Sequence, residues 1–203
     1  NVQFDKRSWQ QRNNIKLNEK SFLLSVPVIS KNKSNQKINE VFIDSKNSFI
    51  EEHKKTIEHN YKKSKYFSKY SELIFKVYDM KHEKLIDLNI DLIKLICKIL
   101  DINFSFTKSS LMNVDHVKEN LILEICKLKK CEEYVSTIGS KIYLKNDHKF
   151  KENSINLNFF EFKNLVYQQL GGNFLNNLSI IDLIFNLGPN SLKYINKNFY
   201  INE

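Results

Sequence analysis

The order of elements between residues 103 and 137 constrains the fold more than any other feature. The segment NFSFTKSS at 103–110 alternates apolar and polar residues, as a half-buried strand does. An amphipathic helical pattern follows from about Asp115 to Lys130, and EYVST at 133–137 reads as a second strand. A strand, a helix and a strand at this spacing predict a crossover unit. We therefore predict an α/β fold with a mostly parallel sheet flanked by helices.

The chain is poor in residues that make linkers. It has 203 residues, of which 41% are hydrophobic, and it contains only two prolines and four glycines. This length and composition suffice for one sizeable core. We predict a single domain over residues 1–203.

A helical stripe between residues 49 and 61 directs one histidine inward. Phe49, His53, Ile57 and Tyr61 recur at steps of four residues, which places them on one helical face. A histidine on such a face is either a core residue that bonds to the backbone or a base that acts on a ligand. Both interpretations stay open from the pattern alone.

The stretch from Val2 to Lys16 gathers large polar side chains around the only tryptophan of the chain. Such side chains suit phosphate oxygens, sugar hydroxyls and base edges. The alternative is a solvated basic loop with one buried tryptophan. The polar members are Lys6, Arg7, Gln10, Gln11, Arg12, Asn13, Asn14 and Lys16, and Phe4 and Trp9 add flat apolar faces.

Several motifs resemble the WbqC-like family, whose members are associated with bacterial O-antigen and other surface-polysaccharide gene clusters. They span nearly the whole chain and are specific in combination. Family members usually carry a further strand and helix with a QPxYxPW-like motif ahead of VQF, so we expect this chain to be N-terminally incomplete or divergent. The motifs are VQF, KRSWQ, RN and I-K within 2–16, SVPV at 25–28, YVSTIGSKIYL at 134–144 and LSIIDLIFNLGPNS at 178–191, with His53, Tyr61, Lys63, Tyr167 and Gln169 between them.

This resemblance implies a cytoplasmic protein of surface-polysaccharide biosynthesis. It places His53 in a recurring motif and so raises its standing as a catalytic residue. It also marks Tyr61 and Lys63, although Lys65 stands where many relatives have a proline, and it marks Tyr167 and Gln169 in a later loop. We expect the Arg12 stretch, the His53 helix and the Tyr167 loop to converge on one cleft.

Small hydroxyl residues lie past the predicted parallel strands. The segments 107–110 and 136–140, the second of which contains Ser136 and Gly139, lie at the carboxyl ends of the two predicted strands, where open α/β sheets place their ligands. Gly139 would let a ligand approach the backbone closely. The alternative is a simple turn into the next helix.

The segment from Leu178 to Ser191 has a local explanation at most positions. Ser179 is a candidate N-cap, Asp182 is placed to answer it in a capping box, and Gly188 with Pro189 ends the helix. Asn186 is the exception, because an amide in an apolar last turn needs partners. It either holds neighbouring loops together or faces a ligand.

Charge and cysteine content exclude several classes. The net charge of +9 comes from lysines scattered along the chain, which argues against nucleic acid as the partner. Three cysteines cannot close a disulfide framework, and this indicates a reducing cytoplasm. No apolar run reaches membrane-spanning length, and the dispersed histidines predict no metal site. We expect no cofactor.

The chain also lacks a Walker loop, a dinucleotide fingerprint and a nucleophile elbow. The remaining prediction is an enzyme that transfers an acyl or aminoacyl group to a nucleotide-linked amino sugar. His53 would be the general base, and Arg12 with Lys6 or Arg7 would bind the diphosphate of a sugar nucleotide or another anionic small molecule. The alternative is a binding protein without chemistry, either a nucleic-acid module or a scaffold in polysaccharide assembly.

Overall fold

The computed structural model describes residues 2–30, 35–114, 116–144, 147–163 and 166–202. The chain divides into two compact units. Unit 1 comprises Asn1–Ser105 and Val166–Tyr194, and unit 2 comprises Phe106–Leu165 and Ile195–Glu203. Each unit has a sheet of its own. The single domain predicted over residues 1–203 stays a prediction.

A hairpin in unit 1 follows the polar opening stretch. β1 (Arg12–Leu17) and β2 (Lys20–Ser25) pair antiparallel, with Arg12 opposite Ser25. Asn18 forms the turn at φ +55°, a conformation that asparagine adopts more readily than most residues. Only Leu24 of β2 is buried. The hairpin fixes Arg12 at the start of a strand.

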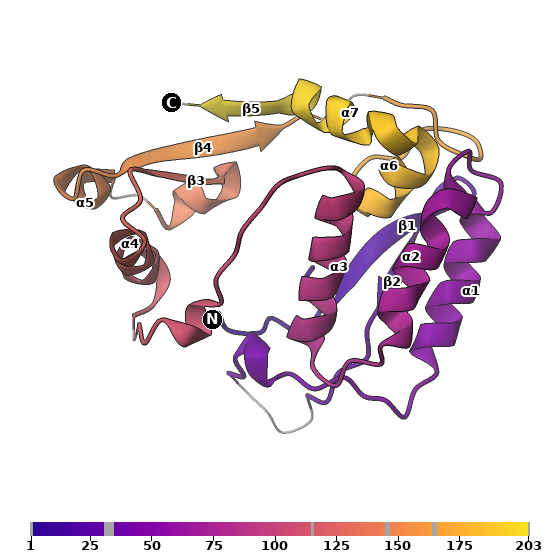
Figure 1. Cartoon of the computed structure of the whole chain (residues 1–203), viewed down its shortest axis with the longest axis horizontal. Coiled ribbons are helices and arrows are strands. Elements are labelled where there is room, and N and C mark those ends of the chain that lie inside the picture. Colours follow the sequence, from indigo (N-terminus) through magenta and orange to yellow (C-terminus); the bar gives the residue numbers. More distant parts are fainter. Residues whose placement is uncertain (1, 31–34, 115, 145–146, 164–165, 203) are drawn as a thin grey trace. The chain divides into compact units, whose positions relative to one another are not determined.

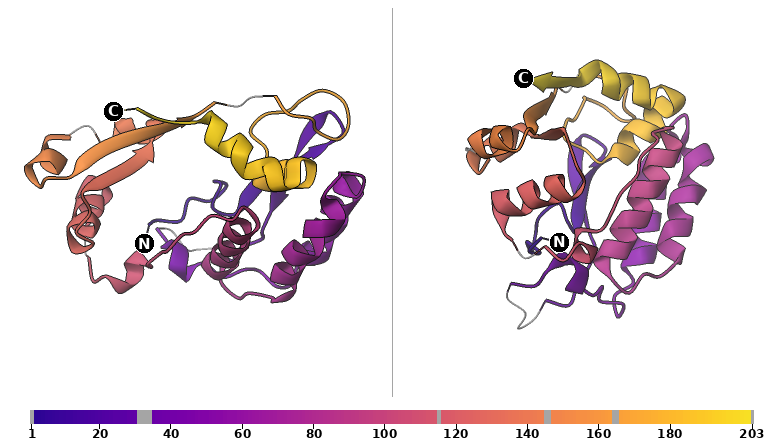
Figure 2. Two further views of the ribbon diagram at one scale, coloured as in Figure 1. Left: turned by 45° about the horizontal axis from the view of Figure 1, so that its top comes forward. Right: turned by 60° about the vertical axis from the view of Figure 1, so that its left-hand side comes forward.

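Helices α1 (Phe49–Tyr61), α2 (Phe67–Asp79) and α3 (Leu85–Ile99) follow, with α1 against α2 and α2 against α3 (Figures 1 and 2). The buried residues of α1 are Phe49, His53, Ile57 and Tyr61, which confirms the predicted stripe. α1 also contacts β1. His53 therefore points into the interior of unit 1.

The later part of unit 1 returns the chain to the same hairpin. α6 (Ile180–Leu187) contacts both β1 and α2, and η4 (Gly188–Asn190) and α7 (Ser191–Asn198) follow it. The division between the units falls within α7. α6 thus brings residues from late in the chain beside the Arg12 strand.

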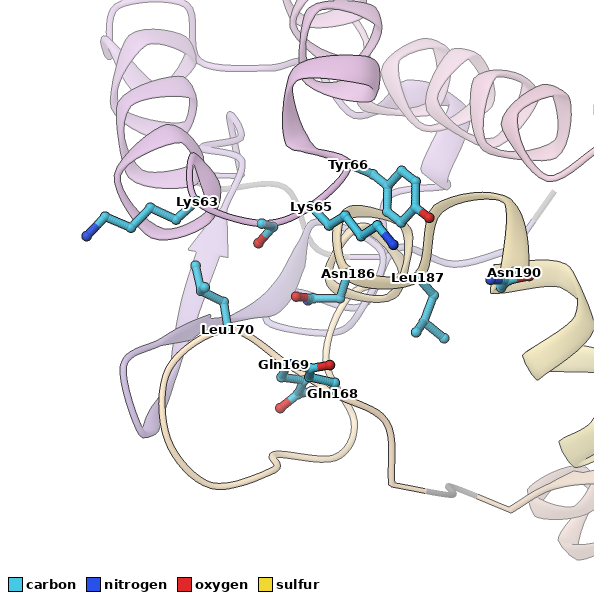
Figure 3. Close-up of a pocket in the computed structure, with 10 residues that line it drawn as sticks. Lys63, Lys65, Tyr66, Gln168, Gln169, Leu170, Asn186, Leu187 and Asn190 are labelled. Carbon is cyan, nitrogen blue, oxygen red and sulfur yellow. The ribbon is translucent and has the colours of Figure 1, made fainter.

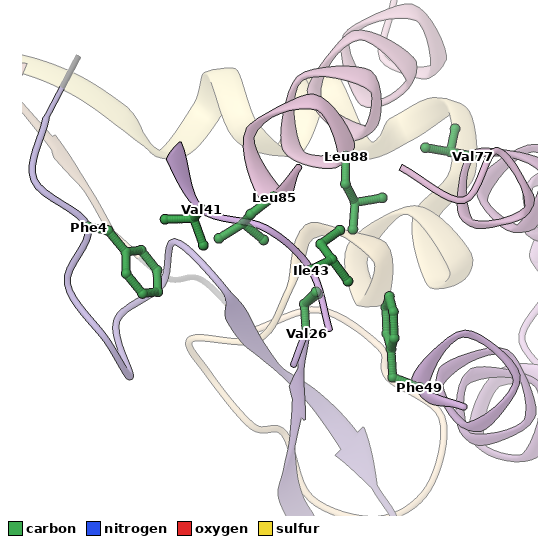
Figure 4. Close-up of a cluster of buried hydrophobic side chains, with 8 residues drawn as sticks. All are labelled: Phe4, Val26, Val41, Ile43, Phe49, Val77, Leu85 and Leu88. Atoms are coloured by element: carbon green, nitrogen blue, oxygen red, sulfur yellow. The ribbon is translucent and has the colours of Figure 1, made fainter. Parts of the chain in front are cut away.

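One hydrophobic cluster anchors the opening stretch to the helices of unit 1 (Figure 4). Phe4 is held by its backbone N–H, which donates to the Gln36 carbonyl at 2.7 Å. Val41, which directly follows η1 (Ile38–Glu40), and Leu85 are fully buried. The Leu85 N–H donates to the Val41 carbonyl. The cluster comprises Phe4, Val26, Val41, Ile43, Phe49, Val77, Leu85 and Leu88.

The sheet of unit 2 is mixed. β3 (Glu133–Thr137) pairs parallel with β4 (Asn156–Phe162), and β4 pairs antiparallel with β5 (Phe199–Asn202). With the antiparallel β1–β2 hairpin, the α/β class is confirmed, but the prediction of a mostly parallel sheet was wrong. Among the described strands of this sheet, β3 and β4 are the one parallel pair, because β5 runs antiparallel to β4.

The crossover unit lies later in the chain than the sequence pattern indicated. Residues 103–108 join no ladder, and η2 (Ser109–Leu111) follows them. α4 (Lys118–Leu128) matches the predicted helix, whose proposed start at Asp115 lies outside the described residues. The crossover instead joins β3 to β4 through η3 (Ile138–Ile142) and α5 (Asp147–Glu152). Alternation at 103–110 favours extended chain, but a strand also needs a partner edge.

Candidate functional site

A pocket of about 400 Å³ in unit 1 joins the opening stretch to the His53 helix. We call it the Arg12–His53 pocket. Its inner wall is apolar and comes mostly from β1, α1, α2, α3 and the start of α6. Its polar lining residues are Gln10, Gln11, Arg12, Asn13, His53, Tyr78, Asn89 and Ser179, and Trp9 lines it as well. A largely apolar pocket with a few polar groups is the usual form of a small-molecule site.

His53 is 6% exposed and faces Tyr78 across the helix pair α1 and α2. The His53 Nδ1 atom lies 3.3 Å from the Tyr78 hydroxyl oxygen, and the two rings meet edge to face. Burial lowers the pKa of His53, although a hydrogen bond to the Ser25 backbone and the charge of Glu52 oppose the shift. Burial also raises the pKa of Tyr78 to about 12. Both rings are therefore neutral at pH 7, and a neutral imidazole can accept a proton.

The mouth of the pocket is formed by the loop before β1. The Gln10 side-chain oxygen accepts from the Asp5 N–H at 3.0 Å, and the Gln10 carbonyl accepts from the Asn89 side chain of α3 at 2.8 Å. These bonds hold the loop against α3. Trp9, by contrast, is 67% exposed and offers a free aromatic face.

Among the described residues, two polar side chains at this mouth have hydrogen-bonding or ion-pairing groups without a partner. Within the described part of the chain, the buried Oε1 atom of Gln11 accepts no hydrogen bond. The half-buried Arg12 guanidinium forms no salt bridge with any residue that the structure describes. Unfilled donors and acceptors on a pocket wall are the groups that a ligand would satisfy. The sequence placed Gln11 among the polar side chains of the opening stretch but gave it no individual role in the site.

The structure brings part of the predicted set together. Trp9, Gln10, Arg12 and Asn13 line the same pocket as His53. The neighbouring cations, Lys6 and Arg7, lie on an exposed turn, where Arg7 has φ +71°, and neither lines this pocket.

A buried hydrogen-bonded cluster, which we call the Asp182 cluster, centres on Asp182 in the first turn of α6. Asp182 is fully buried and accepts from Tyr167 at 2.6 Å, from Tyr61 at 2.9 Å and from the Gln169 amide at 3.0 Å. Burial raises the pKa of Asp182, and these three bonds and the Lys16 charge oppose that shift. Tyr61 in turn accepts from the Lys16 backbone N–H at 2.9 Å.

The Lys16 side chain closes the Asp182 cluster. Its ammonium donates to the Asn173 carbonyl at 2.6 Å and to the Gln169 side-chain oxygen at 3.3 Å, and burial lowers its pKa against the charges of Asp182 and Glu19. The predicted site residues Tyr61, Tyr167 and Gln169 therefore hold β1, α1 and α6 together. The sequence missed Asp182 because its capping-box position gave it a local explanation. Ser179 does occupy the N-cap, but its side chain forms no capping hydrogen bond.

A second pocket of unit 1, of about 370 Å³, lies at the other end of α6 (Figure 3). We call it the polar pocket. It is formed by the turn between α1 and α2, by residues 168–170 and by the end of α6. Its lining residues are Lys63, Ser64, Lys65, Tyr66, Gln168, Gln169, Leu170, Asn186, Leu187 and Asn190. Lys63, Gln169 and Asn186 thus meet here, apart from the Arg12–His53 pocket.

Asn186 and Gly188 shape the wall of the polar pocket. The Asn186 amide donates to the Asp182 carbonyl at 2.7 Å, one turn back along α6. Gly188 has φ +54°, and a Cβ atom there would lie 2.5 Å from the Tyr66 ring. Glycine is therefore required both for the backbone conformation and for the close approach of Tyr66.

Ser136 and Gly139 belong to unit 2, whereas the lining residues of both pockets belong to unit 1. Ser136 is 8% exposed and accepts a hydrogen bond from the Ser140 hydroxyl at 2.8 Å. Beyond the adjoining backbone, no described atom lies within 4 Å of the position that a Cβ atom on Gly139 would take. Their role in ligand binding stays a prediction.

The residues that the structure describes hold neither a metal-ligand group nor a membrane-spanning helix. No group of three or more His, Cys, Asp or Glu side chains gathers there in a way that suits a metal ion. None of the helices in that part of the chain combines the length and apolar character of a membrane span.

Comparison with known proteins identifies the family. The model of the WbqC-like protein family matches residues 1–194, so the chain belongs to this family. It is also similar to the uncharacterized protein Rv1507c of Mycobacterium tuberculosis (strain ATCC 25618 / H37Rv), with 30% identity over 196 residues, which cover 96% of this chain and 84% of that protein. No solved structure matches.

Proposed function

We propose that this protein transfers an acyl or aminoacyl group to a nucleotide-linked amino sugar in bacterial surface-polysaccharide biosynthesis. Membership of the WbqC-like family supports the process. The observation that carries the reaction is the composition of the Arg12–His53 pocket, with an arginine at its mouth, an apolar interior and a neutral His53–Tyr78 pair. The reaction would occur in the cytoplasm, where sugar nucleotides are made.

The mouth of the pocket suits the nucleotide part of the substrate. The planar guanidinium of Arg12 matches two phosphate oxygens at once. Trp9 offers an exposed face on which a base or a sugar ring can stack. Gln11 supplies a buried acceptor that has no partner among the described residues, and an amine or hydroxyl of the ligand would satisfy it.

The interior of the pocket suits the group that is transferred. Its walls include Ile57, Ile74, Leu88 and Leu92, which would bury an apolar acyl chain. The donor would be an acyl or aminoacyl compound activated as a thioester or ester. The sugar nitrogen would attack the acyl carbonyl carbon, the bond to the leaving group would break, and His53 would take the proton that the nitrogen loses.

One observation favours a second candidate, a sugar-nucleotide-binding protein without chemistry. His53 interacts both with the Tyr78 hydroxyl and with the Ser25 backbone, which gives the imidazole partners within the protein. A histidine held in this way can orient the pocket wall without accepting a proton from a substrate. In this candidate function, Arg12 and Trp9 keep their roles and His53 becomes a packing residue.

A donor chain-length series separates the two candidates. The protein is incubated with UDP-glucosamine and acyl coenzyme A donors of increasing length, and the product is detected by its mass. We expect acylated UDP-glucosamine, with donor affinity improving by about 0.8 kcal/mol per added methylene until the apolar interior is filled. A thermal shift with UDP-glucosamine but no product from any acyl or aminoacyl donor would instead support the binding protein.

A further inference from the structure

The polar pocket differs in chemistry from the Arg12–His53 pocket. Its lining residues include the cations Lys63 and Lys65 and contain no carboxylate. Four side-chain amides line it as well, from Gln168, Gln169, Asn186 and Asn190. Ammonium groups favour an anion, and amides donate to and accept from hydroxyl groups. This combination suits a ligand that is both anionic and hydroxylated.

The positions of the two lysines differ. In Figure 3, the Lys65 side chain extends past the Tyr66 ring, and the Lys63 side chain extends in the opposite direction. The Lys65 Nζ atom lies 5.3 Å from the centroid of the Tyr66 ring. Tyr66 is in turn fixed by its N–H, which donates to the Phe185 carbonyl at 3.0 Å. Lys65 is therefore the cation whose ammonium lies near a held aromatic ring of the pocket.

Ser64 supplies an unfilled polar group in the same wall. It is 8% exposed, and its hydroxyl oxygen has no hydrogen-bond partner among the residues that the structure describes. Burying a hydroxyl without a partner costs free energy. One torsion, χ1, sets the direction of this group, so a change to another staggered rotamer would turn it towards a ligand.

Two of the four amides of the pocket are held in place before any ligand arrives. Gln169 donates to Asp182 and to the Leu175 carbonyl, and it accepts from the Leu175 N–H at 2.9 Å. Asn186 is tied to its own helix through the Asp182 carbonyl. Side chains fixed in this way lose little entropy on binding. The volume of about 370 Å³ also falls within the range of small-ligand sites.

We propose that the polar pocket is a second ligand site and binds the phosphate ester of a sugar. Lys65 and the Ser64 hydroxyl contact the phosphate, and Asn186 and Asn190 contact the sugar hydroxyls. The proposal does not depend on the acyl-transfer function, because it rests on residues that do not line the Arg12–His53 pocket.

Lys69 provides a matched control for Lys65. Its Nζ atom lies 5.2 Å from the Tyr70 ring, so it makes the same kind of contact one turn later, and it is likewise exposed. Lys69 does not line the polar pocket. Lys65→Gln and Lys69→Gln therefore remove the same charge and the same ring contact, and only the first changes the pocket.

The test is a calorimetric titration of the full chain with glucose 1-phosphate, glucose and sodium phosphate. We expect saturable binding that is tightest for glucose 1-phosphate. Lys65→Gln should weaken it by about tenfold, since one hydrogen bond to a charged group is lost, while Lys69→Gln and Arg12→Lys leave it unchanged. No saturable binding, equal losses in the two lysine variants, or a loss in Arg12→Lys alone would overturn the proposal.

Ser64→Ala and the ligand comparison complete the test. Ser64→Ala should weaken binding several-fold without lowering the melting temperature, because the hydroxyl has no described partner to lose. A lower melting temperature with unchanged binding would show that Ser64 is structural and would remove it from the site. Equal affinity for sodium phosphate and glucose 1-phosphate would overturn the assignment of a sugar.

Discussion

The Asp182 cluster and the Arg12–His53 pocket both gather polar side chains in unit 1, but they differ in how completely those side chains are paired. In the cluster, each carboxylate oxygen of Asp182 accepts from a tyrosine hydroxyl. At the pocket, Gln11 has an unfilled acceptor and Arg12 forms no salt bridge among the described residues. The comparison indicates that complete pairing marks a structural role and that unfilled groups mark the surface that a ligand uses.

The largest expected effect is the loss of stability when the Asp182 cluster is broken. Asp182→Ala removes the acceptor of Tyr61, Tyr167 and the Gln169 amide, and it removes one of the two carboxylates whose charge favours the buried Lys16 ammonium. We expect the free energy of unfolding to fall by about 3–5 kcal/mol, as when a buried charged network loses one member. Urea unfolding measures this loss. A change below about 1 kcal/mol would mean that the cluster does not stabilise unit 1.

His53→Gln tests the inner end of the Arg12–His53 pocket. If His53 is the general base, turnover should fall by roughly 10²-fold or more, with the melting temperature little changed. His59→Gln is the matched control, because His59 is an exposed residue of the same helix. A lower melting temperature with unchanged turnover would assign His53 to packing and would favour the binding protein.

The stability contributions of His53 in the pocket and Asp182 in the cluster should also change with pH in opposite directions. The folded-state pKa of His53 is lowered, so its contribution to stability is complete above pH ~6.5 and is lost as the pH falls through that value towards the folded pKa. The folded-state pKa of Asp182 is raised, so its contribution is complete below pH ~3.9 and is lost as the pH rises through the folded pKa.

Urea unfolding of the wild type and of His53→Gln between pH 7.5 and 5.5 checks the first of these signs. Each buried group changes stability by at most about 1.4 kcal/mol per pH unit. We expect the wild type to lose stability relative to His53→Gln as the pH falls. Parallel curves for the two proteins would contradict the burial of a neutral imidazole at this position.

Local periodicity predicted much of unit 1. The spacing of Phe49, His53, Ile57 and Tyr61 placed α1 and its buried face, because those residues lie within one helix. The pairing of strands was harder to predict from the sequence. The alternation at 103–110 indicated extended chain, but whether a strand forms depends on a partner edge that no local pattern specifies.

The candidate site shows the same limit. The opening stretch indicated Trp9, Arg12 and Asn13, and the structure places them with His53 in one pocket. Asp182 was missed, because its partner Tyr61 lies 121 residues away and a capping position explained it locally. The sequence also predicted one cleft, whereas Gln169 and Asn186 line a separate polar pocket. Such separations depend on tertiary packing rather than on motif spacing.

The distinction between the two regions is tested most directly by measuring UDP-glucosamine affinity and unfolding free energy together on two variants. Arg12→Lys should weaken binding by about 1–3 kcal/mol and leave unfolding unchanged, because it removes a bidentate fork at the pocket mouth. Arg7→Lys, which lies outside the pocket, is its control.

Tyr167→Phe should do the reverse. It should lower the unfolding free energy by about 1–2 kcal/mol, since Asp182 loses its 2.6 Å donor, and leave UDP-glucosamine affinity unchanged. A loss of stability in Arg12→Lys with full affinity, or a loss of affinity in Tyr167→Phe with full stability, would contradict the assignment of one region to structure and the other to ligand binding.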